Sequence, residues 1–258
     1  PVADSAPAIA RAESPKGRRV GVDWASRSGR EVYRLVCGWS NSVGTMTTRI
    51  VLVPGFWLGQ WAWDDVVPAL RERGFDVVAL TLPGLEPDHR PDATVTLADQ
   101  AAAIEAALDV DVERRILAVH SGAAFPGTLV LDRRPELVDR FVLVDTAPPK
   151  PGLAFNAEQV GDFTVGDAWS GLQEEGSFTD LTAAQLETFR ERAVPQPASL
   201  VTEAVELTND ARHQIPVTVI CTAFPASAYQ EYATQGVPFL AALLDYSDVT
   251  YLDLPTGH

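Results

Sequence analysis

Residues 117–124 read LAVHSGAA, a short apolar stretch that breaks at Ser121 and continues into small residues. Such a stretch is typical of a nucleophile elbow, a strained turn between a strand and a helix that lifts a serine Oγ above the edge of a sheet. The turn needs small neighbours. Gly122 and Ala123 provide them after the serine, but Val119 stands where the usual pattern G-x-S-x-G has a glycine. Taken alone, the stretch fits two interpretations: a nucleophile, or a serine that only caps the following helix.

The sequence on either side of this stretch alternates between strand-like and helix-like segments. Short β-branched or apolar runs predict strands at residues 50–53, 75–82, 115–119, 141–144, 217–221 and 249–254. Apolar residues at helical spacing predict helices at residues 63–73, 94–108, 125–134 and near 237–244. This alternation predicts an α/β fold with a mostly parallel central sheet and helices on both of its faces.

The alternation stops between residues 148 and 213, where three amphipathic pieces near 167–175, 181–194 and 199–207 are separated by Pro and Gly. We therefore expect a core made of residues 46–147 and 214–258. A helical cap of residues 148–213 is inserted after the strand that ends at Asp145. This cap would cover the ends of the strands and set the specificity for substrate.

The first 45 residues differ in composition from the rest of the chain. They hold seven Lys or Arg against four Asp or Glu and are rich in Ala, Ser, Pro and Gly. They end just before Met46, the only methionine. We expect residues 1–45 to be an N-terminal extension that is mostly disordered, with Met46 as the natural start.

Composition excludes several classes of partner. The formal net charge of −15 argues against nucleic acid and against an anionic membrane surface. No apolar run approaches the roughly 18 residues of a membrane span, and residues 1–20 lack the apolar core of an export signal, so we expect a cytoplasmic protein. The two cysteines make no disulfide framework or metal-ligand spacing, and no Gly-rich dinucleotide fingerprint is present. We expect no cofactor, no metal and a small-molecule substrate, and the oligomeric state stays open.

Several chemically useful residues follow the carboxyl ends of predicted strands, where sites form in open α/β sheets. They are Ser121, the loop that begins Pro54-Gly55-Phe56, Asp145 and His258. A serine needs a base to take its proton. Among the four histidines, His258 suits this role, because it follows a strand and the flexible turn Pro255-Thr256-Gly257.

The histidine must in turn be oriented by a carboxylate. Asp145 ends its strand and points toward the same edge, although it would also suit a cap for the next segment. The loop after residues 217–221 contains no acid, and the first acid beyond it is Glu231. We favour Asp145 and keep Glu231 as the alternative.

A tetrahedral oxyanion needs two backbone donors aimed at it. The N–H of Gly122, at the start of a helix, would be one, and the N–H of Phe56 the other, with Gly55 allowing an unusual backbone turn. Trp57 and His120 adjoin these groups, and we expect both to line the substrate pocket, although packing at the sheet edge would also explain the tryptophan.

Taken together, these residues resemble the α/β-hydrolase superfamily over about residues 48–258. The resemblance rests on VPGFW at 53–57, LPG at 82–84, HSG at 120–122, the chain order Ser121, Asp145, His258 and the closing PTGH at 255–258. It implies an esterase-like mechanism in which Ser121 attacks a carbonyl and an acyl-enzyme forms.

The expected function is therefore a small serine esterase-like hydrolase that cleaves a small, mostly apolar ester, thioester or lactone. Two alternatives stay open: an acid–base enzyme similar to hydroxynitrile lyases, and a ligand-binding member of the fold without turnover. The sequence departs from the superfamily pattern at Pro54, where a histidine is usual, and at Val119. Superfamily members usually continue past the histidine that corresponds to His258 into another helix. Whether the sequence is truncated after His258 therefore also stays open.

Overall fold

All six strands of the central sheet run in the same direction. The computed structural model describes residues 47–87 and 95–258. Within these residues the strand order is β2-β1-β3-β4-β5-β6, and every neighbouring pair is parallel. The strands are β1 (Thr48–Val53), β2 (Asp76–Ala79), β3 (Arg114–His120), β4 (Arg140–Val144), β5 (Val217–Cys221) and β6 (Val249–Asp253). The predicted fold class, a mostly parallel sheet with helices around it, is confirmed.

The strands form because their residues are β-branched or apolar and both of their faces are buried. In β3, four consecutive residues from Ile116 to Val119 are buried, so alternate side chains enter the core on opposite faces of the sheet. Because parallel strands end together, the residues that follow β1, β3, β4 and β6 meet at one edge. This edge carries the candidate site.

Helices of different kinds connect the strands. The α-helices are α2 (Val66–Arg71), α3 (Leu97–Leu108), α4 (Ala124–Arg133), α5 (Val165–Glu174), α6 (Ala183–Arg192), α7 (Ala198–Thr202) and α8 (Ala226–Thr234). Short 3-10 helices are η2 (Gln60–Trp63), η3 (Ser121–Ala123), η4 (Pro135–Leu137), η5 (Asp210–Gln214) and η6 (Ala241–Asp245). No helix in the described residues is both long and apolar enough to cross a membrane.

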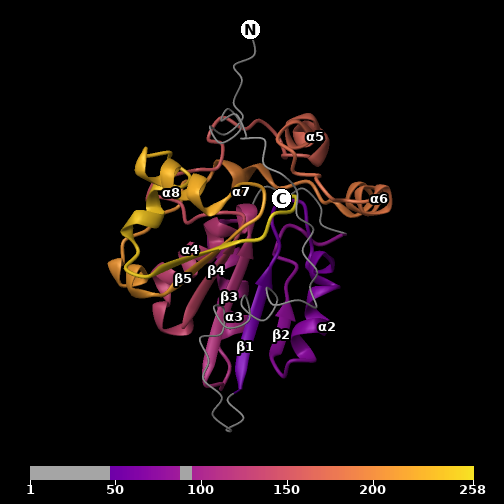
Figure 1. Cartoon of the computed structure of the whole chain (residues 1–258). Coiled ribbons are helices and arrows are strands. Elements are labelled where there is room, and N and C mark those ends of the chain that lie inside the picture. The colour runs from indigo at the N-terminus through magenta and orange to yellow at the C-terminus, as the bar shows by residue number, and fades with distance from the viewer. Residues whose placement is uncertain (1–46, 88–94) are drawn as a thin grey trace. The chain divides into compact units, whose positions relative to one another are not determined.

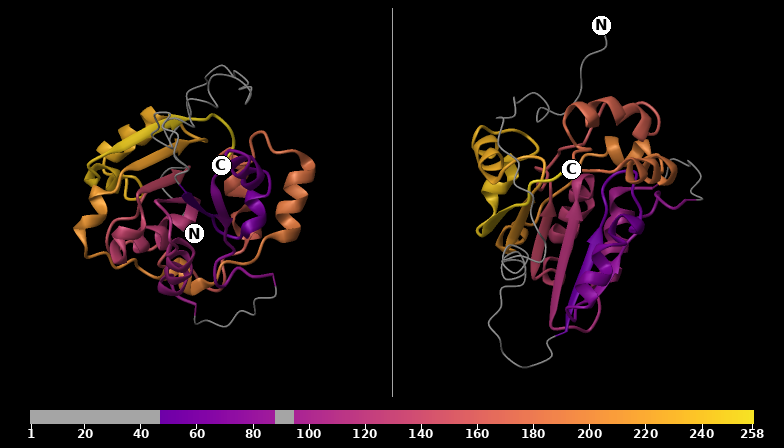
Figure 2. Two further views of the ribbon diagram at one scale, coloured as in Figure 1. Left: turned by 90° about the horizontal axis from the view of Figure 1, so that it is seen from below. Right: turned by 45° about the vertical axis from the view of Figure 1, so that its right-hand side comes forward.

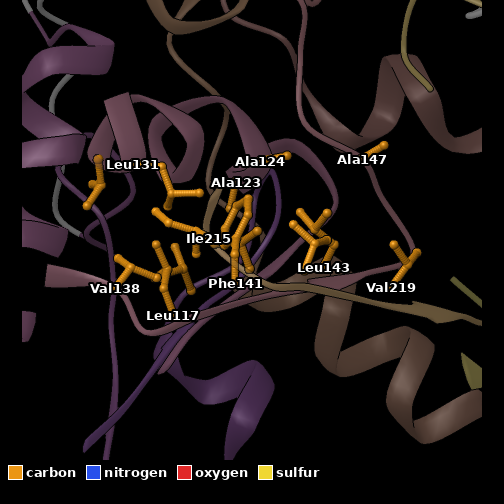
Figure 3. Packing of buried hydrophobic residues seen from close by; sticks show 14 of the residues in the cluster. Leu117, Ala123, Ala124, Leu131, Val138, Phe141, Leu143, Ala147, Ile215 and Val219 are labelled. Carbon is orange, nitrogen blue, oxygen red and sulfur yellow. The ribbon is translucent and has the colours of Figure 1, made fainter. Parts of the chain in front are cut away.

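The main core lies between one face of the sheet and the helices α3, α4 and α8. Leu117, Phe141, Leu143 and Val219 point from the sheet into this cluster, as Figure 3 shows. The helices contribute residues such as Ile104, Leu131 and Ala233, which are fully buried. Burying aliphatic and aromatic side chains at this density is the main source of stability, at about 25 cal/mol per Å² of apolar surface.

Two predicted helices differ from the structure. Residues 63–73 were expected to form one helix, but η2 ends at Trp63 and α2 begins at Val66. The helix expected near residues 237–244 is wrong: these residues form turns and η6, and the helix is α8, directly upstream. Gly236, with φ of +80°, follows α8, and the apolar residues beyond it reach the core from turns.

The segment between β4 and β5 carries α5, α6 and α7, and we call residues 148–213 the cap segment. Figure 1 and the right-hand view of Figure 2 show these three helices beyond the end of the sheet at which the strands finish. Capping boxes begin two of them, with Thr164 and Asp167 at α5 and Thr182 and Gln185 at α6. That these residues act as a cap over a substrate stays a prediction.

The cap segment is joined to the core by a buried ion pair. The carboxylate of Asp132, in α4, accepts hydrogen bonds from the backbone N–H groups of Thr208 and Asn209 and from Arg212. Side chains of Asp132 and Arg212 are only 8% and 5% exposed. The end of the cap segment is therefore fixed against α4 by a paired and hydrogen-bonded buried charge.

Some predictions fall outside the described residues. They are the expectation that residues 1–45 form a mostly disordered extension and the expectation that Met46 is the natural start. Each stays a prediction.

Candidate active site

Ser121 is the first residue of η3, the short turn that leads from β3 directly into α4. Its φ is +51°, a left-handed backbone conformation that is uncommon for a residue with a side chain. Such strain is characteristic of functional turns and persists only where the surroundings enforce it. The turn places the Ser121 Oγ at the carboxyl edge of the sheet, next to the positive end of the α4 dipole.

The bulky residue before the turn is accommodated by a glycine in the next helix. Val119 is fully buried, and a Cβ atom added to Gly127 would lie 2.8 Å from its Cγ1 atom. The absence of a side chain at Gly127, in α4, thus gives Val119 its space. Gly127 in α4 therefore compensates for the absence of a glycine at position 119.

His258 links Ser121 to Asp145. The Nδ1–H of His258 donates a hydrogen bond to Oδ2 of Asp145 at 2.5 Å. Nε2 is then free to accept from the Ser121 hydroxyl, and the Nε2–Oγ distance is 2.9 Å. The structure thus brings together the three residues predicted for catalysis, from the ends of β4, β3 and β6.

Asp145 is held rigidly at the end of β4. It is 8% exposed, its φ is +49°, and its backbone N–H donates to the carbonyl of Ile220. Oδ1 accepts hydrogen bonds from the backbone N–H groups of Thr222 and Ala223, each at 3.3 Å, and from the Tyr229 hydroxyl at 2.7 Å. Both carboxylate oxygens therefore have partners.

The pKa of Asp145 follows from these contacts. Burial alone would raise it, but the hydrogen bond and charge of His258, with the Tyr229 hydroxyl, outweigh burial and lower the pKa to about 2. Asp145 is thus ionised across the physiological range. Burial, and next the charge and hydrogen bond of Asp145, raise the pKa of Tyr229 well above its usual value, so its hydroxyl stays a donor.

The loop after β1 lies directly against the elbow. A Cβ atom on Gly55 would be 2.8 Å from Cβ of Ser121 and 2.9 Å from Nδ1 of His120, so only glycine fits. The ring of Phe56 covers Gly122, where an added Cβ atom would lie 2.5 Å from Cδ1 of the ring. The unusual backbone turn expected at Gly55 is found instead at Trp57, whose φ is +66°. Gly55 is needed because the backbone of this loop lies so close to Ser121 and His120.

The two predicted oxyanion donors are available in this loop and this turn. Within the described residues, neither the N–H of Phe56 nor the N–H of Gly122 donates to a protein acceptor. Since backbone N–H groups are normally paired when buried, these two are candidates for binding a substrate oxygen.

His120 and His258 are close neighbours. Their ring centroids are 4.7 Å apart. Burial, and next the charge of His258, lower the pKa of His120 to about 3, although Asp145 opposes this. His120 is therefore neutral at physiological pH.

Aromatic side chains from the loop after β1 and from the cap segment form one cluster beside Ser121. Phe56 stacks edge-on against Phe155 at 4.7 Å, and Trp57 packs on Phe163 at 4.9 Å. The Trp57 indole N–H donates to the carbonyl of Phe163, and its own carbonyl accepts from the N–H of Val194. The surroundings of the elbow on this side are thus apolar and shared between core and cap segment.

Other sequence candidates lie away from this site. Glu231, the alternative acid, is exposed in α8 and accepts from Gln235. His213, another of the four histidines, lies in η5 and packs against Tyr246. Within the described residues there is no group of three or more His, Cys, Asp or Glu that would hold a metal ion.

Tyr229 was missed by the sequence analysis. Its partner Asp145 is 84 positions away in the chain, so no local pattern connects them. A helix start after Pro225 was a usable signal, because it would have placed Tyr229 on the inward face of α8 with Ala233.

Comparison with known proteins identifies the family. The model of the alpha/beta hydrolase family matches residues 50–254. The chain belongs to the alpha/beta hydrolase family. A search of curated proteins found no match.

Solved structures of alpha/beta hydrolases share the fold at low sequence identity. An extracellular alpha/beta-hydrolase from a Paenibacillus species, described as sharing structural and functional homology with tobacco salicylic acid binding protein 2, is 22% identical with a TM-score of 0.60. The alignment covers 82% of this chain and 91% of that one. The methylesterase MES16 from Arabidopsis is 17% identical with a TM-score of 0.59, covering 80% and 91%. A pyrethroid hydrolase from Sphingobium faniae JZ-2 is 17% identical with a TM-score of 0.59, covering 82% and 90%.

Proposed function

We propose that this alpha/beta hydrolase is a serine hydrolase that cleaves a small, mostly apolar carboxylic ester, thioester or lactone through an acyl-enzyme on Ser121. The observation that carries the proposal is the continuous hydrogen-bonded chain from Ser121 through His258 to Asp145. A nucleophile, a base and a group that orients the base are the minimum that acyl transfer by serine requires.

The first half of the reaction makes the acyl-enzyme. Ser121 Oγ forms a bond to the substrate carbonyl carbon while its proton passes to Nε2 of His258, and the carbonyl electron pair moves onto oxygen. The N–H groups of Phe56 and Gly122 stabilise that oxyanion. The oxyanion then collapses, the bond to the leaving oxygen or sulfur breaks, and His258 returns the proton to the leaving group.

The second half repeats these steps with water. His258 takes a proton from water, the water oxygen attacks the acyl carbon, and Ser121 leaves with the proton from Nε2. Asp145 remains ionised throughout, holds the imidazole in the required tautomer and stabilises its charged form.

The surroundings support an apolar substrate. Phe56, Trp57, Phe155 and Phe163 form the nearest side-chain cluster, and His120 adds a neutral ring beside the base. Two structures with this fold are named as a methylesterase and a pyrethroid hydrolase, which agrees in kind with cleavage of a compact apolar substrate. A cytoplasmic location and the absence of nucleic-acid and membrane partners remain predictions.

A fluorophosphonate probe tests the nucleophile directly. We expect it to label the wild-type protein and not Ser121→Ala. Hydrolysis of short p-nitrophenyl esters should be lost in Ser121→Ala and His258→Ala and kept in Glu231→Gln, which alters an exposed carboxylate. Absence of labelling in the folded wild type would refute the acyl-enzyme. Cyanohydrin cleavage without labelling would identify acid–base chemistry. If the protein neither hydrolyses esters nor cleaves cyanohydrins, it is a binding protein.

A further inference from the structure

The short tail that carries His258 leaves the sheet before it reaches the histidine. The last sheet-type hydrogen bond runs from the N–H of Leu254 to the carbonyl of Cys221. The next backbone hydrogen bond of the tail runs from the N–H of His258 to the carbonyl of Ser177, at 3.0 Å. Ser177 belongs to the cap segment. The candidate base is thus attached at its backbone to the cap segment and not to its own sheet.

Close packing reinforces this attachment one residue earlier. A Cβ atom on Gly257 would lie 2.6 Å from the carbonyl oxygen of Ser177 and 3.2 Å from the N atom of Thr179, and would overlap the carbonyl oxygen of Thr179 as well. These are backbone atoms, which cannot rotate away as a side chain can. Gly257 therefore packs directly against the backbone of the turn formed by residues 176–179.

The turn itself is firmly built at the end of α5. The N–H of Ser177 donates to the carbonyl of Leu172, and both the N–H and the Oγ1–H of Thr179 donate to the carbonyl of Gly176. Gly176 has a φ of +78°, as expected where a helix ends in a left-handed residue. Phe178 packs on Trp169 of α5, with ring centroids 4.5 Å apart. The turn therefore moves with α5 as one unit.

We propose that the turn at residues 176–179 is the positioning element for His258, so that the base is aligned with Ser121 only while α5 and its turn are docked on the tail. This inference rests on the proposed function and adds a specific role for the cap segment. Displacing the turn by about 1 Å would misalign Nε2 and Oγ, a change that costs on the order of 100-fold in rate in a preorganised site. Substrate affinity would change little, because the turn holds the base and not the aromatic cluster.

Gly257→Ala tests this with Gly171→Ala as the matched control. Gly171 lies within α5 of the same cap segment, and an added Cβ atom there meets nothing within 4 Å. We expect Gly257→Ala to lower kcat for p-nitrophenyl esters and the fluorophosphonate labelling rate by about 100-fold, with KM within about threefold. Gly171→Ala should match the wild type. Equal behaviour of the two variants would overturn the proposal.

A second variant covers the case in which Gly257→Ala fails to fold. Thr179→Val removes the hydroxyl that closes the turn, and Thr188→Val removes a similar hydroxyl-to-carbonyl hydrogen bond in α6. We expect Thr179→Val to lower kcat by about threefold to tenfold and Thr188→Val to have no effect. Equal kcat values in the two variants would contradict the proposal that the turn positions His258.

Combining Gly257→Ala with His258→Ala separates positioning of the base from general damage. If Gly257 acts only through His258, adding its substitution to His258→Ala should not lower the residual labelling rate further. A further loss of similar size would show a structural effect and overturn the proposal. Failure of the proposed function gives a different result, since the wild type itself would then remain unlabelled.

Discussion

The hydroxyl of Tyr229 donates a 2.7 Å hydrogen bond to Oδ1 of Asp145, on the side of the carboxylate opposite His258. Tyr229 is 4% exposed and lies in α8, so the bond is shielded from water. It fixes the rotation of the carboxylate and so the direction in which Oδ2 meets the imidazole. Tyr229 thus helps to hold the carboxylate in the orientation in which it meets His258.

Tyr229→Phe should therefore weaken both stability and activity. Removing a donor to a buried charged group costs about 1–3 kcal/mol in the free energy of unfolding. We expect kcat to fall by about tenfold with little change in KM, as for an outer-shell orienting contact. Urea unfolding and ester hydrolysis measure the two effects. Tyr232→Phe is the control, because Tyr232 lies in the same helix and its hydroxyl has no hydrogen-bond partner among the described residues. Equal effects of the two substitutions would contradict an orienting role.

Asp145→Asn and Glu231→Gln form a pair that compares the two acids. Each replaces a carboxylate by its amide, but only the first lies against His258. An amide at position 145 no longer stabilises the charged imidazole and favours the wrong tautomer, so kcat/KM should fall by about 1,000-fold or more. Glu231→Gln should keep wild-type kinetics. A large loss in the second variant and not in the first would make Glu231 the orienting acid.

Gly127→Ala should destabilise the fold although alanine is the better helix former. The new Cβ atom would collide with Cγ1 of Val119, and overpacking of this kind costs about 1–3 kcal/mol in the free energy of unfolding. Helix propensity returns up to about 1 kcal/mol. The urea midpoint should fall, and Gly171→Ala, where the space is open, should show no such fall.

The pair Val119→Ala and Gly127→Ala checks the cause of this loss. If the collision is responsible, the double variant should be more stable than the sum of the two single changes predicts, by about 1 kcal/mol or more. Strict additivity would mean that Gly127 is required for another reason.

These contacts also indicate what the sequence was able to predict. Strands such as β1 and β3 were evident because a strand buried on both faces contains an unbroken apolar run that includes β-branched residues. Ser121, Asp145 and His258 could be chosen because parallel strands bring their carboxyl ends to one edge. In both cases a short stretch of sequence predicts where a residue lies in the fold, because the geometry of parallel sheets is general.

Contacts between distant segments could not be predicted in this way. Val119 looked unfavourable because the glycine that makes room for it lies on another element. The helix near residues 237–244 was wrong because buried apolar residues also enter a core from turns and short 3-10 helices, as Leu240 and Leu243 do. The support of His258 by Ser177 uses backbone atoms, which carry no signature of residue type.

His120 gives the protein a specific sensitivity to acid. Its pKa is lowered to about 3 in the folded state, mainly by burial and then by the charge of His258, while an unfolded histidine has a pKa near 6.5. Between these two values the unfolded chain binds a proton that the folded protein does not. Stability is thus fully present above about pH 6.5 and falls as the pH decreases toward 3, by up to about 1.4 kcal/mol per pH unit.

His120→Asn should remove this sensitivity, because asparagine does not titrate. We expect urea midpoints measured at about pH 7 and about pH 5 to lie closer together in the variant than in the wild type. Asp145 contributes little to this difference, since its folded pKa of about 2 and its unfolded value of 3.8 both lie below pH 5. Because the two proteins differ only at this residue, the difference in slope reports the contribution of His120. An identical fall in the two proteins would mean that His120 is protonated in the folded state as readily as in the unfolded chain, and that its ring is not excluded from water beside His258.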